Sequence, residues 1–268
     1  MNKVSTTRAS QGIKVPRLLT VKEAFPLTPN MIRVTFAGEE LAGIPAGREG
    51  ANCKILLPAP GQSRAAFAEQ LQDGPRPVIR TYTMRHFRED LLEMDIDFVV
   101  HGDAGPASAW AASATPGSFC GFRGPSGVKV EQFVADWYLV AADMSALPVA
   151  AATLEAMPRD AKGVAIFEIT TADDRQAIDV PPGFEVHWLL HRDPHVPSRT
   201  QVDFIRSMRW REGRVQTCIA GESNVIRALR EFLHKDKQLP RADTYISGYW
   251  KIGLVEDEHQ KIKRLEAA

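Results

Sequence analysis

The segment FRGPSGVKV at residues 122–130 divides the sequence into two parts with different patterns. Before it, apolar runs of strand length are separated by turns that contain glycine and proline; after it, apolar runs alternate with segments of helical periodicity. A chain of 268 residues also exceeds the usual size of one domain. The sequence therefore predicts two domains, over residues 1–128 and 129–268, with this glycine- and proline-containing segment as the hinge.

Six apolar runs make up the first part: RLLTVKEAF, MIRVTFAG, ANCKILLP, VIRTYTMRHF, EMDIDFVVH and SFCGFRGP. In EMDIDFVVH (93–101) the apolar residues Met94, Ile96 and Phe98 alternate with acidic residues, which is typical of a β-strand. Short strands with turns between them predict a six-stranded antiparallel barrel. One helix, GPASAWAASA at 105–114, interrupts the series.

The second part alternates strands and helices. The expected strands are WYLVAAD (137–143), GVAIFEIT (163–170), FEVHWLLH (184–191), VQTCIAG (215–221) and DTYISGYW (243–250). Helices are expected over 145–157, 198–210 and 223–235, followed by a polar C-terminal helix. This alternation predicts a doubly wound parallel sheet, so the fold class is a β barrel plus an α/β domain.

Bulk properties narrow the class of protein. The chain has 44% hydrophobic and 25% charged residues and a formal net charge of zero, so net charge predicts neither a nucleic-acid partner nor a membrane surface. It has no apolar stretch of 18 residues and no apolar targeting core at the N-terminus, which predicts a cytoplasmic protein. Cys53, Cys120 and Cys218 are widely spaced and predict buried thiols in a reducing compartment.

No metal site is expected. His191 and His195 in HRDPH have a spacing that would suit two ligands on one helix, but Pro194 breaks such a helix and no third ligand is evident. A loop is the better interpretation. The sequence also has no G-x-S-x-G, which argues against a serine hydrolase.

The strand VIRTYTMRHF (78–87) contains the first residues that suit a cofactor. Alternation places Arg80 and Tyr82 on one face of the strand, and Thr81 and Thr83 on the other. Arg80 could hold a phosphate of FAD, with Tyr82 beside the ring system and Thr83 bonded to its edge. A half-buried strand with a surface arginine explains the same pattern, so spacing alone leaves both interpretations open.

The turn in HGDAGPASAW (101–110) enters a helix, and a helix N-terminus favours an anion. Gly105 permits close approach, and Ser108 offers a hydroxyl group from the first turn. A plain strand-to-helix connection is the alternative. Together with the preceding strand, the turn favours a flavin site.

Two later turns follow strands of the parallel sheet, where open α/β sheets receive nucleotides. Asp143 ends one strand, and Ser145 can cap the following helix. Gly221 and Glu222 repeat the arrangement at a later strand. Neither turn contains G-x-G-x-x-G, so either one could be purely structural.

The chain resembles the siderophore-interacting proteins, which are FAD-containing ferric-siderophore reductases. The resemblance is carried by RTYT (80–83), DFVVHGDAGPASAWA (97–111), AADMSALP (141–148), AGESNVIRALR (220–230) and YWKIG (249–253), in the family's order. It implies an FAD-binding barrel related to ferredoxin-reductase-like enzymes, followed by an NAD(P)H domain. The family's usual GDETALP differs here at Ala142, Met144 and Ser145, and its YWRxG has Lys251 in place of arginine.

The resemblance and these turns together give a set of candidate site residues. The predicted cofactor-binding residues are Arg80, Thr81, Tyr82, Thr83, Asp97, His101, Gly105, Pro106, Ala107, Ser108, Asp143, Ser145, Ala146, Leu147, Gly221 and Glu222. The resemblance also implies basic residues at an open substrate pocket, and Lys54 and Lys251 are the candidates. Ferric siderophores are often anionic, so cations at the pocket would attract them. For Lys54, an outward-facing position on an edge strand is the alternative.

The implied reaction has two steps: NAD(P)H reduces FAD, and the flavin then returns electrons singly to the iron of a ferric siderophore. Such electron transfer needs no general acid or base, so none is predicted. The donor stays open among NADH, NADPH and a reduced protein such as ferredoxin. A general flavin reductase and a non-enzymatic siderophore carrier are the alternative functions.

Overall fold

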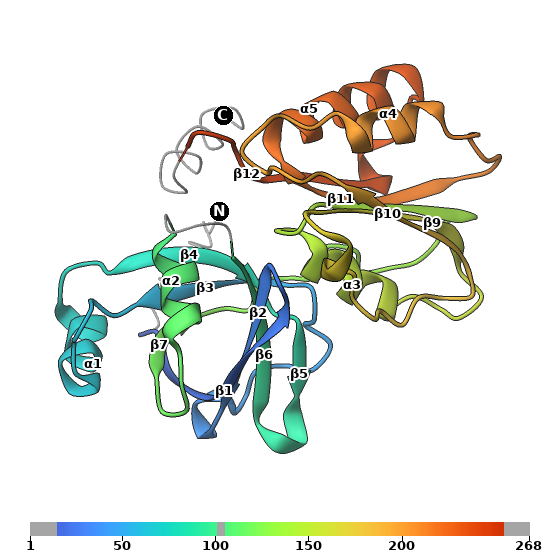
Figure 1. Cartoon of the computed structure of the whole chain (residues 1–268). Helices are drawn as coiled ribbons and strands as arrows, with labels where there is room; N and C mark the ends of the chain where they lie inside the picture. The colour runs from blue at the N-terminus through green and yellow to red at the C-terminus, as the bar shows by residue number, and fades with distance from the viewer. Residues whose placement is uncertain (1–14, 101–104, 255–268) are drawn as a thin grey trace, which may run out of the picture.

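The computed structural model describes residues 15–100 and 105–254. Two sheets, each with its own hydrophobic core, follow one another along the chain and belong to two adjoining parts of the molecule (Figure 1). The first sheet is antiparallel and the second is parallel. Among the described residues, no helix combines the length and apolar character needed to span a membrane.

The antiparallel sheet has the strand order β4-β3-β7-β1-β2-β6-β5. Its strands are β1 (Arg17–Thr28), β2 (Met31–Ala37), β3 (Asn52–Leu57), β4 (Val78–Thr83), β5 (His86–Arg88), β6 (Glu93–Val99) and β7 (Phe119–Arg123). Helices α1 (Arg64–Asp73) and α2 (Pro106–Ser113) complete this part. The prediction of an antiparallel barrel is confirmed, with seven strands instead of six.

The extra strand arises because the predicted strand 78–87 is two strands. The backbone N–H of Met84 donates to Ala51 beside β3 (2.9 Å), and that of the next residue, Arg85, donates to Asp95 of β6 (2.9 Å). The chain therefore passes at these two residues from one end of the sheet to the other, which brings the two ends together. Helix α1 was not predicted, although Ser63 caps it by accepting from the N–H of Ala66 (3.2 Å).

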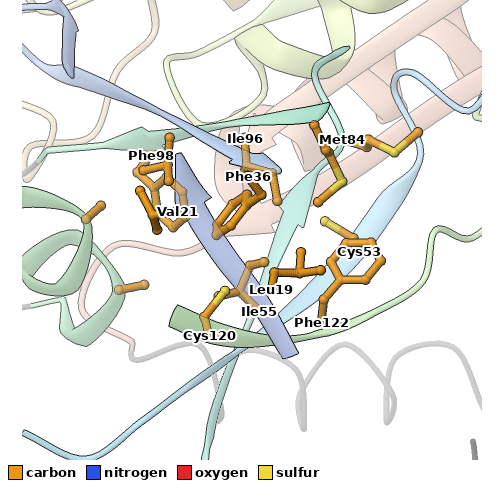
Figure 2. Close-up of a cluster of buried hydrophobic side chains, with 14 of the residues drawn as sticks. Leu19, Val21, Phe36, Cys53, Ile55, Met84, Ile96, Phe98, Cys120 and Phe122 are labelled. Atoms are coloured by element: carbon orange, nitrogen blue, oxygen red, sulfur yellow. The ribbon is translucent and has the colours of Figure 1, made fainter. Parts of the chain in front are cut away.

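The core of the antiparallel sheet is built from the inward-facing residues of its strands. Figure 2 shows Leu19, Phe36, Ile55, Ile96 and Phe122 converging from five different strands. Cys53 and Cys120 belong to the same core, and Cys218 is buried in the second part, which confirms the prediction of three buried thiols.

Strand β6 is buried on both faces. Met94, Ile96 and Phe98 face the core, as the alternation predicts. The opposite face carries Asp95 and Asp97, which are also buried because arginine side chains cover them. Ion pairing therefore replaces solvent on the outer face of this strand.

The parallel sheet has the strand order β10-β9-β8-β11-β12. Its elements are β8 (Trp137–Ala142), α3 (Leu147–Glu155), β9 (Lys162–Ile169), β10 (Gly183–Leu190), α4 (Thr200–Ser207), β11 (Val215–Glu222), α5 (Ser223–Glu231) and β12 (Thr244–Trp250). Helix α3 covers one face, while α4 and α5 cover the other (Figure 1). This confirms the predicted doubly wound sheet. The predicted C-terminal helix lies outside the described residues.

The two parts are joined by polar contacts at two separate places. The guanidinium group of Arg85 binds both carboxylate oxygens of Glu155 at the end of α3 (2.6 Å each). In the β1–β2 hairpin, the Thr28 hydroxyl (2.9 Å) and the Asn30 backbone N–H (3.0 Å) and side-chain amide (2.8 Å) donate to Asp174, which follows β9. These contacts hold the barrel against the C-terminal end of α3 and against the turn that follows β9.

Candidate functional site

Strand β4, which carries the quartet RTYT, is an end strand of the antiparallel sheet, and its one partner among the described strands is β3. Arg80 and Tyr82 lie opposite Ile55 and Cys53, whose side chains belong to the core, so the predicted division of β4 into two faces is confirmed. Arg80 donates from Nη1 to the carbonyl of Ile79 (2.9 Å), which keeps its guanidinium group close to the strand.

A row of aromatic rings continues from β4 toward α2. The ring of Tyr82 lies 4.3 Å from that of Phe98 on β6, and Phe98 lies 5.7 Å from Trp110 on α2, measured between ring centroids. Trp110 in turn stacks on Phe36 at 6.2 Å. The sequence reasoning missed Phe98 and Trp110, since their relation to Tyr82 depends on three separate elements. Phe98 and Phe36 are fully buried. The accessible part of this apolar wall, next to the strand that holds Arg80, therefore consists of Tyr82 and Trp110.

Helix α2 begins beside this wall. Its N-cap residue is Gly105, Pro106 occupies the first turn, and none of the described side chains caps the helix. The remaining N–H groups of the first turn can therefore bind an anion. Ala107 packs into the barrel core and Ser108 is buried, so the exposed part of this turn is Gly105 and Pro106. His101 lies outside the described residues.

Asp97 has a partner of its own on the barrel. Both carboxylate oxygens accept from Arg33 across the β2–β6 pair (2.7 and 2.8 Å). Asp97 therefore points to the face of β6 opposite Phe98. In this position it holds the end of β6 in place and does not reach the aromatic wall.

The C-terminal strand of the parallel sheet meets β4 at Thr83. The phenol of Tyr249 on β12 is hydrogen bonded to the hydroxyl of Tyr245 (3.0 Å) and interacts with the Thr83 side chain. Burial raises the pKa of Tyr249 well above its ordinary value and that of Tyr245 to about 12, so both phenols stay protonated at neutral pH. The side chain of Lys129 lies over the Tyr245 ring, 6.0 Å from its centroid, and burial lowers its pKa.

Asp143 organises the carboxyl ends of three parallel strands. Its carboxylate accepts from the N–H and hydroxyl groups of Ser145 (2.9 and 2.6 Å), the N–H of Ala146 (3.2 Å), the N–H of Glu222 (2.8 Å) and the indole of Trp250 (2.7 Å). Burial raises the pKa of Asp143, while the bonds from Ser145 and Trp250 act in the opposite direction. The structure thus brings together residues that the sequence reasoning placed in two separate turns, and adds Trp250.

The prediction that Ser145 caps α3 is wrong. The N-cap residue is Ala146, and the Ser145 hydroxyl donates to Asp143 and accepts no hydrogen bond from the helix. Asp143 instead accepts from the two N–H groups that precede the helix. Leu147 begins α3 and is buried in the core between the helix and the sheet.

Glu222 occupies the N-terminus of α5. Its carboxylate accepts from the N–H groups of Asn224 (2.6 Å) and Val225 (3.1 Å), and more weakly from that of Ile252 (3.3 Å). Gly221 precedes it at a φ of 151°, where a Cβ atom would lie 2.7 Å from Oδ2 of Asp143. A side chain at Gly221 would therefore displace the Asp143 carboxylate.

The two predicted substrate lysines lie on different parts. Lys54 is exposed on the outer face of β3, where its ammonium group donates to the Thr81 hydroxyl. Lys251 is half-buried directly after β12, next to Trp250. Residues 191–199 form a loop, which confirms the interpretation of the two histidines there, and the described residues contain no cluster of metal ligands.

An antiparallel barrel followed by a parallel sheet in the order 3-2-1-4-5 is a ferredoxin-reductase-like fold. The structure of ferredoxin–NADP+ reductase from Plasmodium falciparum is similar to this chain with a TM-score of 0.59, over 87% of this chain and 96% of that one. At 11% identity this similarity shows the fold alone.

Sequence comparison identifies the family within this class of fold. The description "Siderophore-interacting FAD-binding domain" matches residues 20–129, and "Siderophore-interacting protein" matches residues 135–253. The chain is 33% identical over 255 residues to ferric vibriobactin reductase ViuB of Vibrio cholerae, covering 92% of this chain and 93% of ViuB. It is also similar to the siderophore-interacting protein SipS from Aeromonas hydrophila, at 32% identity and a TM-score of 0.81 over 94% of this chain and 98% of SipS. The chain belongs to the siderophore-interacting protein family, and its barrel is an FAD-binding domain.

Proposed function

We propose that the protein is a cytoplasmic flavoenzyme that reduces ferric siderophores and uses NAD(P)H as the electron donor. The observation that carries the proposal is the similarity to a ferric vibriobactin reductase over nearly the whole of both chains. The three buried, free cysteines support a reducing compartment. We place the FAD domain at residues 1–128 and the NAD(P)H domain at 129–268.

The geometry of the barrel fits FAD. The partly exposed rings of Tyr82 and Trp110, which pack on the buried Phe98, suit a flat aromatic ring system, and the uncapped first turn of α2 suits a pyrophosphate. Arg80 would supply the cation for the pyrophosphate, and Thr83 would contact the flavin edge. When bound, FAD would accept a hydride from NAD(P)H and pass single electrons to ferric iron.

The residues around Asp143 have a supporting role in this proposal. The carboxyl ends of β8 and β11 are where a doubly wound sheet receives a nucleotide. Asp143 and Glu222 are fully engaged with backbone and indole donors, so they shape this crevice and hold Gly221 close to it. Ser145 and the backbone of Ala146 and Leu147, whose side chains are buried, would form its other side at the start of α3.

The substrate would approach between the two domains. Lys54 and Lys251 would attract the anionic ferric complex, while the protonated phenols of Tyr245 and Tyr249 add no negative charge that would repel it. Charge attraction of this kind raises the rate of encounter and weakens with salt.

Anaerobic reductive titration tests the proposal. The FAD-loaded protein is titrated with NADH, NADPH or reduced ferredoxin, and then mixed with a ferric tris-catecholate or a ferric hydroxamate in the presence of a ferrous-specific chelator. Bleaching of the flavin by a nicotinamide donor followed by ferrous iron release supports the proposal. Bleaching without iron release indicates a general flavin reductase, and iron-chelate binding without bleaching indicates a carrier.

The site assignment is tested separately by Arg80→Ala. Loss of a charged hydrogen bond to phosphate costs about 1.5–3 kcal/mol, so FAD affinity should fall roughly 10- to 150-fold. Arg76→Ala, an exposed arginine four residues earlier, is the matched control. Equal FAD affinity in both variants would show that Arg80 does not hold the cofactor.

A further inference from the structure

Asn52 is the first residue of β3 and lies directly opposite Thr83 of β4. Residues that face one another in an antiparallel pair share a face of the sheet, so the two side chains are neighbours. Thr83 is the residue that meets Tyr249 of the parallel sheet. Asn52 therefore lies where the edge of the barrel, the segment around Ser126 and β12 come together, because the N–H of Ser126 donates to the Asn52 backbone carbonyl (2.9 Å).

The side-chain carbonyl of Asn52 lacks a partner. Among the residues that the structure describes, Oδ1 is shut off from water and accepts no hydrogen bond. The hydroxyl groups of two neighbouring residues have other partners: Ser126 donates to Gly127 (3.2 Å), and Thr83 interacts with Tyr249. A buried acceptor left without a donor costs about 1–3 kcal/mol, so its retention points to a donor that arrives with a ligand.

We propose that Asn52 binds the imide edge of the isoalloxazine ring. Oxidised isoalloxazine has one N–H group, N3–H, and it stands between the C2 and C4 carbonyl groups. A primary amide is complementary to this edge: Oδ1 accepts from N3–H while Nδ2 donates to one adjacent carbonyl oxygen. The proposal rests on the FAD site described above and does not depend on which substrate is reduced.

The chemistry of the orphaned atom argues against the substrate as its partner. A ferric siderophore presents deprotonated oxygen ligands around the iron, which are acceptors and would face Oδ1 without a hydrogen. Lys54 lies two residues along the same face of β3, but its ammonium group donates to Thr81. A flavin N–H is the donor that both fits the acceptor and belongs next to β4.

The test compares FAD with its N3-methyl analogue, in which the donor is replaced by a methyl group. Apoprotein is titrated with each flavin and binding is followed by the visible flavin spectrum. The wild-type protein should prefer FAD by about tenfold, as expected for one buried hydrogen bond and its complementary partner. Asn52→Leu should bind FAD about tenfold more weakly and bind both flavins equally within about twofold.

Ser126→Ala is the matched control, because it changes the neighbouring hydroxyl and keeps the backbone bond to Asn52. It should retain the wild-type preference for FAD. Asn52→Asp keeps an acceptor for N3–H and adds a negative charge beside a ring that gains electrons, so it should retain the preference and lower the flavin midpoint potential. If Asn52→Leu does not fold, the proposal is tested by the midpoint potential of Asn52→Asp and by the preference of the wild-type protein for FAD over its N3-methyl analogue.

Equal affinity of the wild-type protein for the two flavins would overturn the proposal, as would a preference that survives in Asn52→Leu. An Asn52→Asp variant with an unchanged midpoint potential would also contradict it. Failure of the wild-type protein to bind FAD at all would instead remove the cofactor site proposed above. If the carboxamide of the nicotinamide is the true partner of Asn52, Asn52→Leu should weaken NADH or NADPH binding and leave flavin binding unchanged. This result too would overturn the proposal.

Discussion

Replacing Asp174 by asparagine should loosen the contact between the two parts of the protein. Asp174 is completely buried, and five donors surround its carboxylate. Three belong to the β1–β2 hairpin, from Thr28 and Asn30, and two are the N–H (2.9 Å) and hydroxyl (3.0 Å) of Thr171. Because all five groups donate, an amide N–H₂ in either orientation must face donors.

The cost can be worked out from the least unfavourable orientation. Oδ1 accepts from the Thr28 hydroxyl and the Asn30 N–H, whereas Oδ2 accepts from three groups. With the amide nitrogen at the Oδ1 position, the Thr28 hydroxyl can turn and accept, but the Asn30 N–H loses its acceptor at a cost of about 1–3 kcal/mol. The three bonds that remain lose their charge assistance, which adds about 1 kcal/mol. The total of about 2–4 kcal/mol should lower Tm by roughly 4–16 °C.

Thermal unfolding followed by circular dichroism measures this effect, and Asp173→Asn is the matched control because Asp173 is the exposed neighbour in the same turn. Hydrogen exchange at the amides of Asn30 and Thr171 gives a local measure, and both should exchange faster in Asp174→Asn. If the two variants unfold within about 1 °C of one another, the carboxylate does not carry the contact, and the argument from the five donors is wrong.

The same residue makes stability depend on pH. Burial alone would raise the pKa of Asp174, but the bonds from Asn30, Thr171 and Thr28 hold it below its ordinary value. The stability that the ionised Asp174 carboxylate adds is therefore fully present above the unfolded-state pKa of about 4 and is lost as the pH falls through the lower folded-state pKa. Between about pH 4 and pH 2 the wild-type protein should lose more stability than Asp174→Asn. Parallel stability curves for the two proteins over this range would contradict the assignment.

Two further substitutions test other contacts. Glu155→Gln leaves the buried guanidinium group of Arg85 without its charged partner and should cost about 1.5–3 kcal/mol in chemical denaturation, whereas a loss below about 0.5 kcal/mol would show that the pair adds little. Gly221→Ala places a Cβ atom 2.7 Å from the Asp143 carboxylate, so it should lower both Tm and NAD(P)H affinity. Gly43→Ala is the control, because Gly43 also has a positive φ but has open space around it. It should cost only the backbone strain of about 1–2 kcal/mol and leave NAD(P)H affinity unchanged.

Local patterns predicted most of the fold because they record which face of each element is buried. The alternation in EMDIDFVVH and the continuous apolar run in WYLVAAD correspond to β6 and β8. The crossing from β4 to β5 was not predicted, because Met84 and Arg85, where the chain crosses, are neither glycine nor proline nor another residue typical of turns. The chain changes partners there without a local signal, since the change is determined by β3 and β6 on either side.

The candidate site was predictable only in part, for a related reason. The strand RTYT and the start of α2 could be found from spacing, since each is a single local element. The bond between Asp143 and Trp250 joins residues 107 positions apart, and nothing in either turn indicates it. Asp173 and Asp174 are likewise adjacent and identical in sequence, yet only Asp174 receives donors from a hairpin more than 140 residues away.

The position of β7 affects how the nascent chain can fold. In the order β4-β3-β7-β1-β2-β6-β5, this strand alone connects the β3–β4 pair to the other four strands. Gly121 in its centre allows an approach so close that a Cβ atom would lie 2.9 Å from Cβ of Leu56 on β3. Until residues 119–123 have left the ribosome, the barrel therefore consists of two separate sheets with open edges at β1 and β3. Such edges are prone to wrong pairing, so protection by chaperones should matter most during synthesis of the segment that precedes β7.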